Sequence, residues 1–314
     1  MISLDVEMFW GVTKSRTFEN YGENILNEFE SVRRTMQLFK KYNVIGTWCV
    51  VGFMLERNKE SLQKYLPASR PAYTEPKDHT YSFLENLKKE DEKYFFDAQI
   101  RELLKEENKQ EVGSHSFSHY YSNQCKDSSI FRDDVAANDK IFQDTFHSNP
   151  TSYIFPRNQV NDEHLQVLKS YNYTCYRGND KNDYYSSNSI RNRVTRLLDS
   201  YINITGRHTH SYLKLETEPL VNIPASFILR PFSKHKSLNM LQKRRLKKAM
   251  EHAAKKKELF HLWWHPHNLG KDLDENFTFL EDILKQYKEL NEKYNFKSYS
   301  MSQLAQIIQQ QKQN

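Results

Sequence analysis

Two histidines four positions apart, in the segment Glu111-Val-Gly-Ser-His115-Ser-Phe-Ser-His119, are the residues of this chain that most directly suggest chemistry. Imidazoles at this spacing lie on one face of a helical turn, and two neutral imidazoles aimed at one point are a frequent way to hold zinc. The chain has 12 histidines among 314 residues, so such a pair also arises by chance. The pair therefore indicates a metal site only if other polar residues are expected close to it.

Four polar clusters each follow a short apolar run that reads as a strand. These clusters are Asp5-Val-Glu7, the pair His115 and His119, Pro156-Arg157-Asn158, and His265-Pro266-His267. Reactive groups of parallel α/β folds sit at the carboxyl ends of strands, so we expect the four clusters to converge. One carboxylate with two imidazoles suits Zn²⁺, and also Fe, Ni, Co or Mn. Alternatively, Asp5-Val-Glu7 could be a solvated strand end and His265 a packed histidine, neither with a function. Because four such clusters occur at four successive strand ends, we favour a functional site.

The elements that must position these clusters alternate between short apolar runs and helical patterns. We expect strands at residues 2–4, 47–51, 111–114, 152–156, 173–176, 220–228, 259–264 and 296–299. We expect helices at residues 25–41, 53–65, 97–107, 130–146, 162–170, 238–257, 273–294 and 302–311, with Asp97 and Asp162 as caps. This alternation predicts a mainly parallel sheet. We expect one domain over residues 1–314, with polar insertions at about 67–95 and 179–217.

Composition limits the classes of function. The net charge of +6 permits polyanionic partners without requiring nucleic acid, and no nucleic-acid-binding motif is present. Three widely spaced cysteines favour a reducing compartment, and no apolar run is long enough to cross a membrane. The chain begins in a strand-like run without a leader pattern, so we expect a cytoplasmic protein. The basic segment from Leu238 to Lys257 is either a solvated helix face or a contact to a polyanion or the inner membrane face.

Together these motifs resemble the polysaccharide deacetylases of the NodB-homology type, carbohydrate esterase family 4. The match to His115-Ser-Phe-Ser-His119 is close, and Ser3-Leu-Asp5-Val-Glu7 is similar to the D-x-E variant found in branches linked to surface-polysaccharide biosynthesis. Residues 46–52, 111–119, 152–158 and 263–268 also look like that branch, in the family's order. The resemblance implies a distorted (β/α)7 barrel that removes an acyl group, such as N-acetyl, from an amino sugar of a polysaccharide or glycan precursor.

The resemblance also implies roles for individual residues. Glu7, His115 and His119 would hold a divalent metal, most simply Zn²⁺, which activates water. Asp5 would be the general base and His265 the general acid, with His267 a competing choice for the acid. Arg157 would keep Asp5 ionised, and a backbone N–H near Tyr120 or Tyr121 would stabilise the oxyanion. Residues expected to contact substrate are Trp10, Tyr120, Asn158 and His267.

The chain departs from the family pattern in its later motifs. Ile154 stands where many members have an arginine before the proline, and Arg157 instead follows Pro156. The tryptophan motif expected near residues 176–183 is not recognisable. Two other readings stay open: a deformylase or cyclic-amide hydrolase on the same fold, and a non-catalytic carbohydrate-binding relative. Retention of both an acid and a base favours an enzyme.

Overall fold

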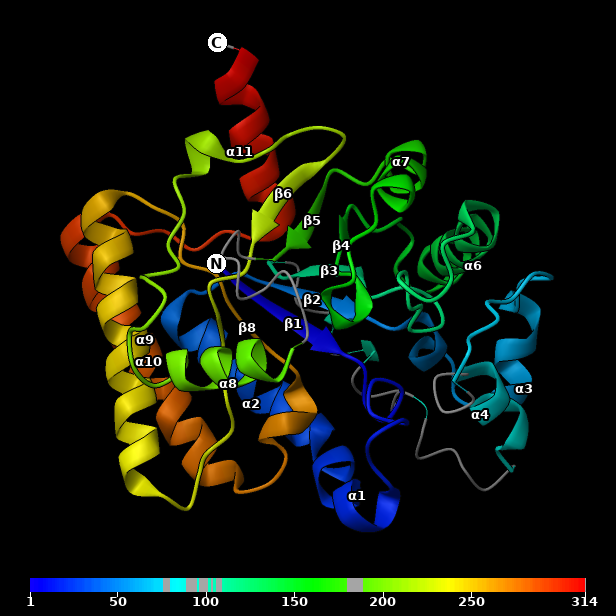
Figure 1. Ribbon diagram of the computed structural model, residues 1–314, viewed down its shortest axis with the longest axis horizontal. Coiled ribbons are helices and arrows are strands. Elements are labelled where there is room, and N and C mark those ends of the chain that lie inside the picture. The colour runs from blue at the N-terminus through cyan, green and yellow to red at the C-terminus, as the bar shows by residue number, and fades with distance from the viewer. Residues whose placement is uncertain are drawn as a thin grey trace.

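The computed structural model describes residues 1–75, 80–88, 95, 101–102, 104–105, 109–179 and 189–313. Its centre is a parallel sheet with the strand order β6-β5-β4-β3-β2-β1-β8-β7, which Figure 1 shows curled among surrounding helices. The strands are β1 (Ile2–Val6), β2 (Gly46–Val50), β3 (Glu111–Ser114), β4 (Ser152–Tyr153), β5 (Cys175–Gly178), β6 (Val221–Pro224), β7 (Phe227–Ile228) and β8 (Leu262–Trp264).

The two outer strands of this order, β6 and β7, are consecutive in the chain and close the sheet into a ring. Strand β6 pairs with β5, and β7 pairs with β8. Between them, the N–H of Ala225 donates to the carbonyl of Gly178 at 3.0 Å, and the N–H of Ser226 donates to the carbonyl of His261 at 2.8 Å. The broken run β6–β7 therefore acts as one side of a seven-sided barrel, which confirms the predicted distorted (β/α)7 fold.

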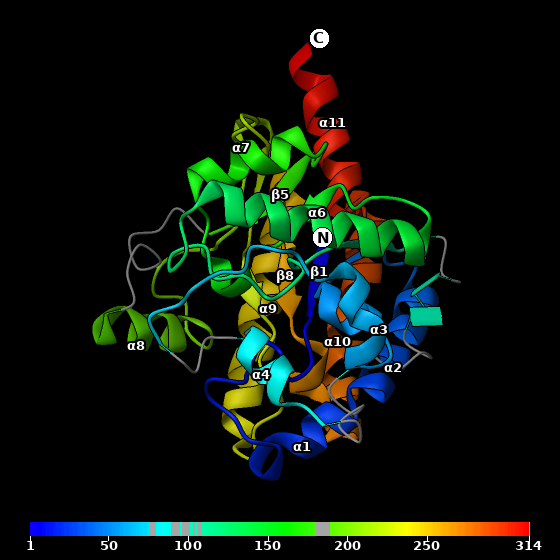
Figure 2. The same cartoon turned by 90° about the vertical axis from the view of Figure 1, so that its right-hand side faces the viewer.

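Helices cover the outside of the barrel (Figures 1 and 2). They are α1 (Phe18–Leu26), α2 (Glu28–Tyr42), α3 (Lys59–Leu62), α4 (Thr80–Asn86), α6 (Ser128–Phe146), α7 (Asp162–Ser170), α8 (Ile190–Asp199), α9 (Lys236–Lys256), α10 (Leu273–Tyr294) and α11 (Met301–Gln313). Helices α9 and α10 pack together on one flank, and α6 packs on α7. In the described part of the chain, no helix has both the length and the apolar composition needed to cross a bilayer.

Strand β1 lies in the middle of the sheet, between β2 and β8. All five of its residues are buried, as expected for a strand covered on both faces. Asp5 is the fourth of them, and Glu7 follows the last. The central position of β1 therefore brings both carboxylates to the mouth of the barrel, where the neighbouring strands also end.

Most of the predicted elements are present, and the differences are local. The predicted helix at residues 53–65 is broken into η1 (Gly52–Leu55), α3 and η2 (Gln63–Tyr65), because the side chain of Asn58 caps a new turn. Helix α7 is capped by Asn161 rather than by Asp162. The strand predicted at residues 296–299 is wrong, since this segment is irregular. The helix predicted at residues 97–107 lies largely outside the described residues.

Candidate active site

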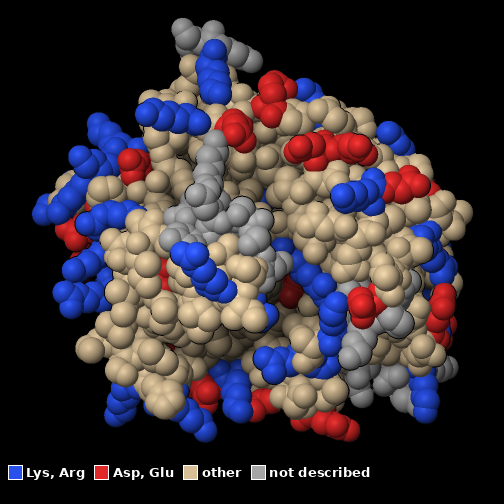
Figure 3. Space-filling view, in the orientation of Figure 1, with Lys and Arg blue, Asp and Glu red and all other residues tan. Residues whose placement is uncertain are grey.

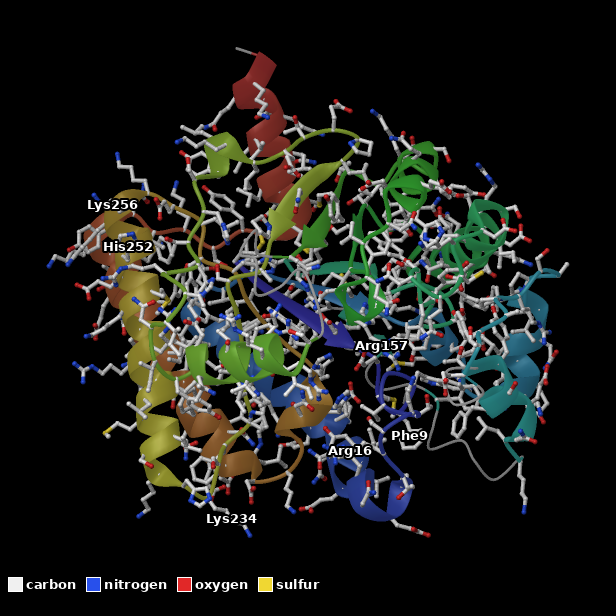
Figure 4. All side chains as sticks on the ribbon, viewed as in Figure 1. Phe9, Arg16, Arg157, Lys234, His252 and Lys256 are labelled. Carbon is white, nitrogen blue, oxygen red and sulfur yellow. The ribbon has the colours of Figure 1, made fainter. Side chains whose placement is uncertain are left out.

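The polar clusters at the strand ends converge at the mouth of the barrel. Asp5 and Glu7 come from β1, His115 and His119 from the loop after β3, and His265 from the end of β8. In Figure 3 the face toward the viewer is hollowed near the centre, with acidic atoms visible at the bottom of the hollow. Figure 4 shows Arg157 beside the tip of β1, at this same mouth. The clusters therefore lie together, as the strand-end rule predicted.

Glu7 and the histidine pair form a compact three-residue cluster. The carboxylate oxygen Oε2 of Glu7 lies 3.1 Å from Nε2 of His115 and 3.0 Å from Nε2 of His119. All three residues are buried. Gly11 leaves room for this carboxylate, because a Cβ at Gly11 would lie 2.0 Å from Cδ of Glu7. Ligand atoms around one Zn²⁺ stand roughly 3 to 3.5 Å apart when each bond is about 2 Å. The two distances from Glu7 fall in this range, and the three ligand atoms all lie within 4.8 Å of one another.

The hydrogen bonds of His115 are compatible with a cation between these groups. Nδ1 of His115 lies 2.9 Å from the carbonyl of Ile154, and a carbonyl can only accept, so the proton of a neutral ring is on Nδ1. Nε2 then presents a lone pair to Glu7 Oε2, itself an acceptor. Two acceptors at 3.1 Å repel unless a proton or a metal ion lies between them. The donor set of two imidazoles and one carboxylate suits Zn²⁺ and related divalent ions.

The loop that carries the histidines is held in an unusual conformation by a carboxylate from α6. Ser116 and His119 both have positive φ, 62° and 57°. The carboxylate of Asp134 accepts from the N–H of Phe117 at 2.9 Å and from the N–H of Ser118 at 3.1 Å. Burial raises the pKa of Asp134 to about 6, although these hydrogen bonds oppose that rise. Asp134 therefore fixes the loop that aims both imidazoles at Glu7.

Asp5 is held by an arginine that the sequence analysis did not select. The guanidinium of Arg177, on β5, donates to Oδ1 of Asp5 at 2.6 Å and to Oδ2 at 2.7 Å. Arg177 also donates to Oδ1 of Asn158 at 2.9 Å and stacks on the ring of Trp263 at 4.1 Å. Burial opposes ionisation of Asp5, but the charge of Arg177 prevails and lowers the pKa of this carboxyl. Asp5 is therefore a buried, oriented carboxylate.

The expectation that Arg157 holds Asp5 is corrected by this pairing. Arg157 is exposed and donates to the hydroxyl of Tyr121 at 3.1 Å, with its guanidinium 3.9 Å from the ring centre. That hydroxyl lies 3.2 Å from Nδ1 of His119. Arg157 has φ of 56° in the turn after β4, which directs it toward Tyr121, whereas β5 brings Arg177 alongside β1 inside the barrel. Arg157 therefore has no direct role at Asp5 and is linked to His119 through the hydroxyl of Tyr121.

His265 stands across from the two carboxylates. Its Nε2 lies 3.4 Å from Oε1 of Glu7 and 3.7 Å from Oδ2 of Asp5, and the side chain is 21% exposed. The amide nitrogen of Asn268 lies 3.1 Å from Nδ1 of His265, while the Asn268 oxygen accepts from the hydroxyl of Tyr21 at 2.6 Å. Because that amide nitrogen donates to Nδ1, the proton of a neutral His265 is on Nε2. The ring therefore presents a proton to the hollow.

Three residues expected to contact substrate are buried instead. Trp10 is 0% exposed and packs edge-on against Phe53. Tyr120 is also 0% exposed and donates to the carbonyl of Cys125. His267 is 1% exposed and stacks on His265. A buried ring offers no face to a sugar, so these three expectations are corrected, whereas half-buried Asn158 keeps a place at the mouth of the barrel.

The backbone groups expected to stabilise an oxyanion are already used within the protein. The N–H of Tyr120 donates to Oγ of Ser116 at 2.8 Å, and the N–H of Tyr121 donates to the hydroxyl of Tyr73 at 3.0 Å. A donor that is satisfied in this way has no proton to offer an oxyanion. This expectation is therefore also corrected.

Sequence reasoning missed Arg177, Asp134 and the side chain of Tyr121, which was expected to contribute only a backbone N–H. Arg177 follows the predicted strand at residues 173–176, so the strand-end rule could have selected it. Asp134 lies in the middle of a helix, and Tyr121 lies in a loop. Neither position carries a local signal, because each acts only through a contact made in the folded chain.

Comparison with solved structures finds proteins that share the fold of this barrel. A protein from Mycobacterium smegmatis named as a polysaccharide deacetylase is 13% identical with a TM-score of 0.63, covering 99% of this chain and 90% of its own. One so named from Pseudomonas aeruginosa PAO1 is 12% identical with a TM-score of 0.57, covering 97% and 88%. The PuuE allantoinase is 10% identical with a TM-score of 0.57, covering 97% and 88%.

The family model for polysaccharide deacetylases matches residues 17–176, about half of the chain. The protein therefore belongs to the polysaccharide deacetylase family, which supports a deacetylase activity in general. No curated protein matches the sequence. At these low identities, the solved structures show a shared fold, and the roles of the residues rest on the geometry described above.

Proposed function

We propose that this protein is a metal-dependent hydrolase that removes an N-acetyl or other acyl group from an amino sugar in a polysaccharide or glycan precursor. One observation carries the proposal. An oriented carboxylate, Asp5, and a proton-bearing imidazole, His265, flank a cluster with the spacing of a metal site. Amide hydrolysis needs these three functions together, because amides are weak electrophiles with poor leaving groups.

Glu7, His115 and His119 would hold the divalent ion, with Zn²⁺ the simplest choice and Co, Ni, Mn or Fe as alternatives. When bound, such an ion supplies a Lewis acid that polarises the acyl oxygen and activates water. The carbonyl of Ile154 and the hydroxyl of Tyr121 contact the outer nitrogens of the two rings and set their orientation. Arg157 would act at this point as a positioning residue for Tyr121.

Asp5 would take the proton of the attacking water while the water oxygen forms its bond to the acyl carbon. The bidentate contact with Arg177 keeps Asp5 ionised at neutral pH and fixes the plane of its carboxylate. His265, once protonated to the imidazolium, would then give its Nε2 proton to the departing nitrogen as the carbon–nitrogen bond breaks, and would return to the neutral ring. The products are a free carboxylic acid and a free amine. Asp5 receives one proton and His265 releases one, so the pair is reset by a single proton exchange with solvent.

The D-x-E spacing of Asp5 and Glu7 supports a finer proposal about the substrate. This variant resembles branches linked to surface-polysaccharide biosynthesis, so we propose a cytoplasmic enzyme acting on a precursor. The three cysteines are free and buried, which agrees with a reducing compartment. Comparing acetate release from a nucleotide-linked or lipid-linked amino sugar with release from the finished polymer tests this point.

The decisive experiment measures bound metal and acetate release from N-acetylated oligosaccharides. Wild-type protein should contain about one divalent ion per chain and release acetate. His115→Ala should lose both properties, because it removes one ligand of three. His235→Ala is the matched control, since His235 is exposed at the start of α9 and its side chain caps nothing.

The alternatives give different results in the same experiment. A cyclic-amide hydrolase, suggested by the similar fold of the allantoinase, would hydrolyse allantoin or another cyclic amide and leave the N-acetyl group intact. A deformylase would release formate from an N-formyl sugar. A binding module would hold the oligosaccharide without releasing any acid, even with Zn²⁺ supplied, and that result would refute the proposed hydrolysis.

A further inference from the structure

Helix α8 turns an apolar side toward solvent. Ile190 is 81% exposed, Val194 48%, Leu197 44% and Leu198 47%. At 100° per residue these four positions span an arc of about 100° on one side of the helix. The segment that follows continues the surface with Ile202 and Ile204, both more than half exposed. Helices of globular proteins normally direct such an arc inward, so α8 has the reverse orientation.

The polar side of α8 is the side that faces the protein. Asp199, opposite the apolar arc, is 3% exposed and lies in a buried cluster. Its carboxylate is 2.8 Å from Nε2 of His208 and 3.2 Å from Nη2 of Arg245, a residue of α9. The hydroxyl of Ser200, just after α8, accepts from Arg230 at 2.9 Å. These contacts fix the rotation of α8, so the exposed apolar arc is built into the fold.

Positive charge borders the apolar arc on both sides. Arg191 lies at one edge of the arc and Arg193 at the other, and both are exposed. Beyond Ile202, a hollow of about 280 Å³ is lined by Arg207, Arg244 and Lys248, among others. Figure 2 shows α8 at the outer edge of the molecule, where a flat surface could approach it. An apolar strip bordered by cations matches the boundary between the acyl chains and the phosphates of an anionic bilayer.

Helix α9 alone does not provide such a surface, although its sequence suggested it. Leu246 and Met250 are buried, and only Met240 is an exposed large apolar residue among those described in this helix. Lysines and arginines gather over this flank of the molecule in Figure 3. Helix α9 can therefore contribute electrostatic attraction, whereas α8 supplies the apolar insertion that holds a protein at an interface.

We propose that α8 docks this protein on an anionic phospholipid surface. Ile190, Val194, Leu197 and Leu198 enter the boundary between headgroups and acyl chains, and the bordering arginines contact lipid phosphates. The lining of the hollow, Arg207, Arg244 and Lys248, takes a further headgroup. The proposal is independent of the hydrolytic function, because none of these residues belongs to the site at the barrel mouth.

Co-sedimentation with vesicles tests this docking. Wild-type protein should bind vesicles of phosphatidylglycerol and phosphatidylcholine in equal parts, bind pure phosphatidylcholine weakly, and be released by salt. The double variant Leu197→Ser and Leu198→Ser should bind the anionic vesicles about tenfold or more weakly, because it removes two inserted side chains. Arg191→Gln with Arg193→Gln should weaken binding and flatten its dependence on salt. Leu26→Ser, at the end of α1 and 62% exposed in the wild type, is the matched control and should bind normally.

Three results would overturn the docking. The first is wild-type protein that does not bind the anionic vesicles. The second is a serine double variant that binds as well as the control while circular dichroism shows both folded. The third is a wild-type dimer in sedimentation that the serine double variant converts to monomer, since the arc would then be an interface between two copies. Acetate release from a soluble oligosaccharide should be equal in all four proteins, so a failed hydrolytic function and a failed docking are distinguished.

Discussion

Two buried clusters in this molecule are built from the same residue types, Asp, Arg and His. At the barrel mouth, Asp5 pairs with Arg177 and faces His265. Beside α8, Asp199 pairs with Arg245 and His208. Both aspartates are less than 5% exposed, and surrounding donors lower the pKa of both carboxyls despite burial. Composition and burial therefore do not distinguish the two clusters.

The clusters differ in how the carboxylate oxygens are used. One oxygen of Asp199 accepts from the N–H groups of Ile204 and Thr205, each at 2.8 Å, and the other contacts both His208 and Arg245. The oxygens of Asp5 each accept one hydrogen bond from Arg177, and Nε2 of His265 lies 3.7 Å away, beyond hydrogen-bond length. A carboxylate has about four acceptor positions, so Asp5 keeps capacity toward the hollow. Unused acceptor capacity facing a hollow distinguishes Asp5, the proposed base, from Asp199.

The largest difference between the two clusters is expected when each aspartate is replaced by asparagine. Asp5→Asn should lower kcat for acetate release about a thousandfold, because an amide cannot accept the proton of water. Asp199→Asn should leave kcat close to the wild-type value. Metal content and circular dichroism should show that Asp5→Asn is folded and loaded. Equal losses of kcat in the two variants would contradict the distinction between the clusters.

Replacing the arginines by lysine should sharpen the comparison. Arg177→Lys should lower kcat about a hundredfold with little change in KM, since a lysine ammonium cannot make the two parallel contacts that orient Asp5. Arg245→Lys should lower the melting temperature and leave kcat nearly unchanged. Steady-state kinetics and thermal unfolding of both variants give the result. A loss confined to KM in Arg177→Lys would argue for a role in binding substrate.

Asp134 is another buried carboxylate, and its oxygens hold the histidine loop. Asp134→Asn should weaken Zn²⁺ binding by roughly tenfold to a hundredfold, because an amide nitrogen in place of one oxygen would face a backbone N–H. Isothermal titration calorimetry of Zn²⁺ measures this change. Asp133→Asn, at the neighbouring position of the same helix, should bind Zn²⁺ like the wild type. Unchanged affinity in Asp134→Asn would show that the loop holds its shape without this carboxylate.

The smallest effect concerns the stability that Asp199 contributes and its dependence on pH. The folded state lowers the pKa of Asp199, so its contribution is present above the unfolded pKa of about 4 and is lost as the pH falls below it. Asp199→Asn should lower the free energy of unfolding by about 1.5 kcal/mol at pH 7. The difference in the free energy of unfolding between Asp199→Asn and the wild type should become smaller below about pH 4. Urea unfolding at several pH values measures this difference. A difference that increases in acid would show that folding raises the pKa of Asp199 instead of lowering it.

The sequence by itself predicted the fold class and which polar clusters lie together. The alternation of apolar runs with helical patterns predicted a mainly parallel sheet, because burial on both faces demands continuous apolar strands. The family resemblance implied that this sheet forms a distorted barrel. The strand-end rule then brought together Asp5, Glu7, His115, His119 and His265, since parallel strands present their carboxyl ends at one edge. These predictions succeeded because each depends on spacing along the chain and on the direction of the strands.

Only the tertiary structure decided which neighbours complete the site and which aromatic residues are available. Arg177 rather than Arg157 meets Asp5, because strand order places β5 across the barrel from β1. Trp10 and Tyr120 lie in the core, and the rotation of α8 follows from the anchoring of Asp199. Such choices depend on contacts between residues far apart in the chain. Residue type and local spacing determine the helix or strand in which each side chain lies. Packing decides which of these side chains face a hollow, a partner or solvent.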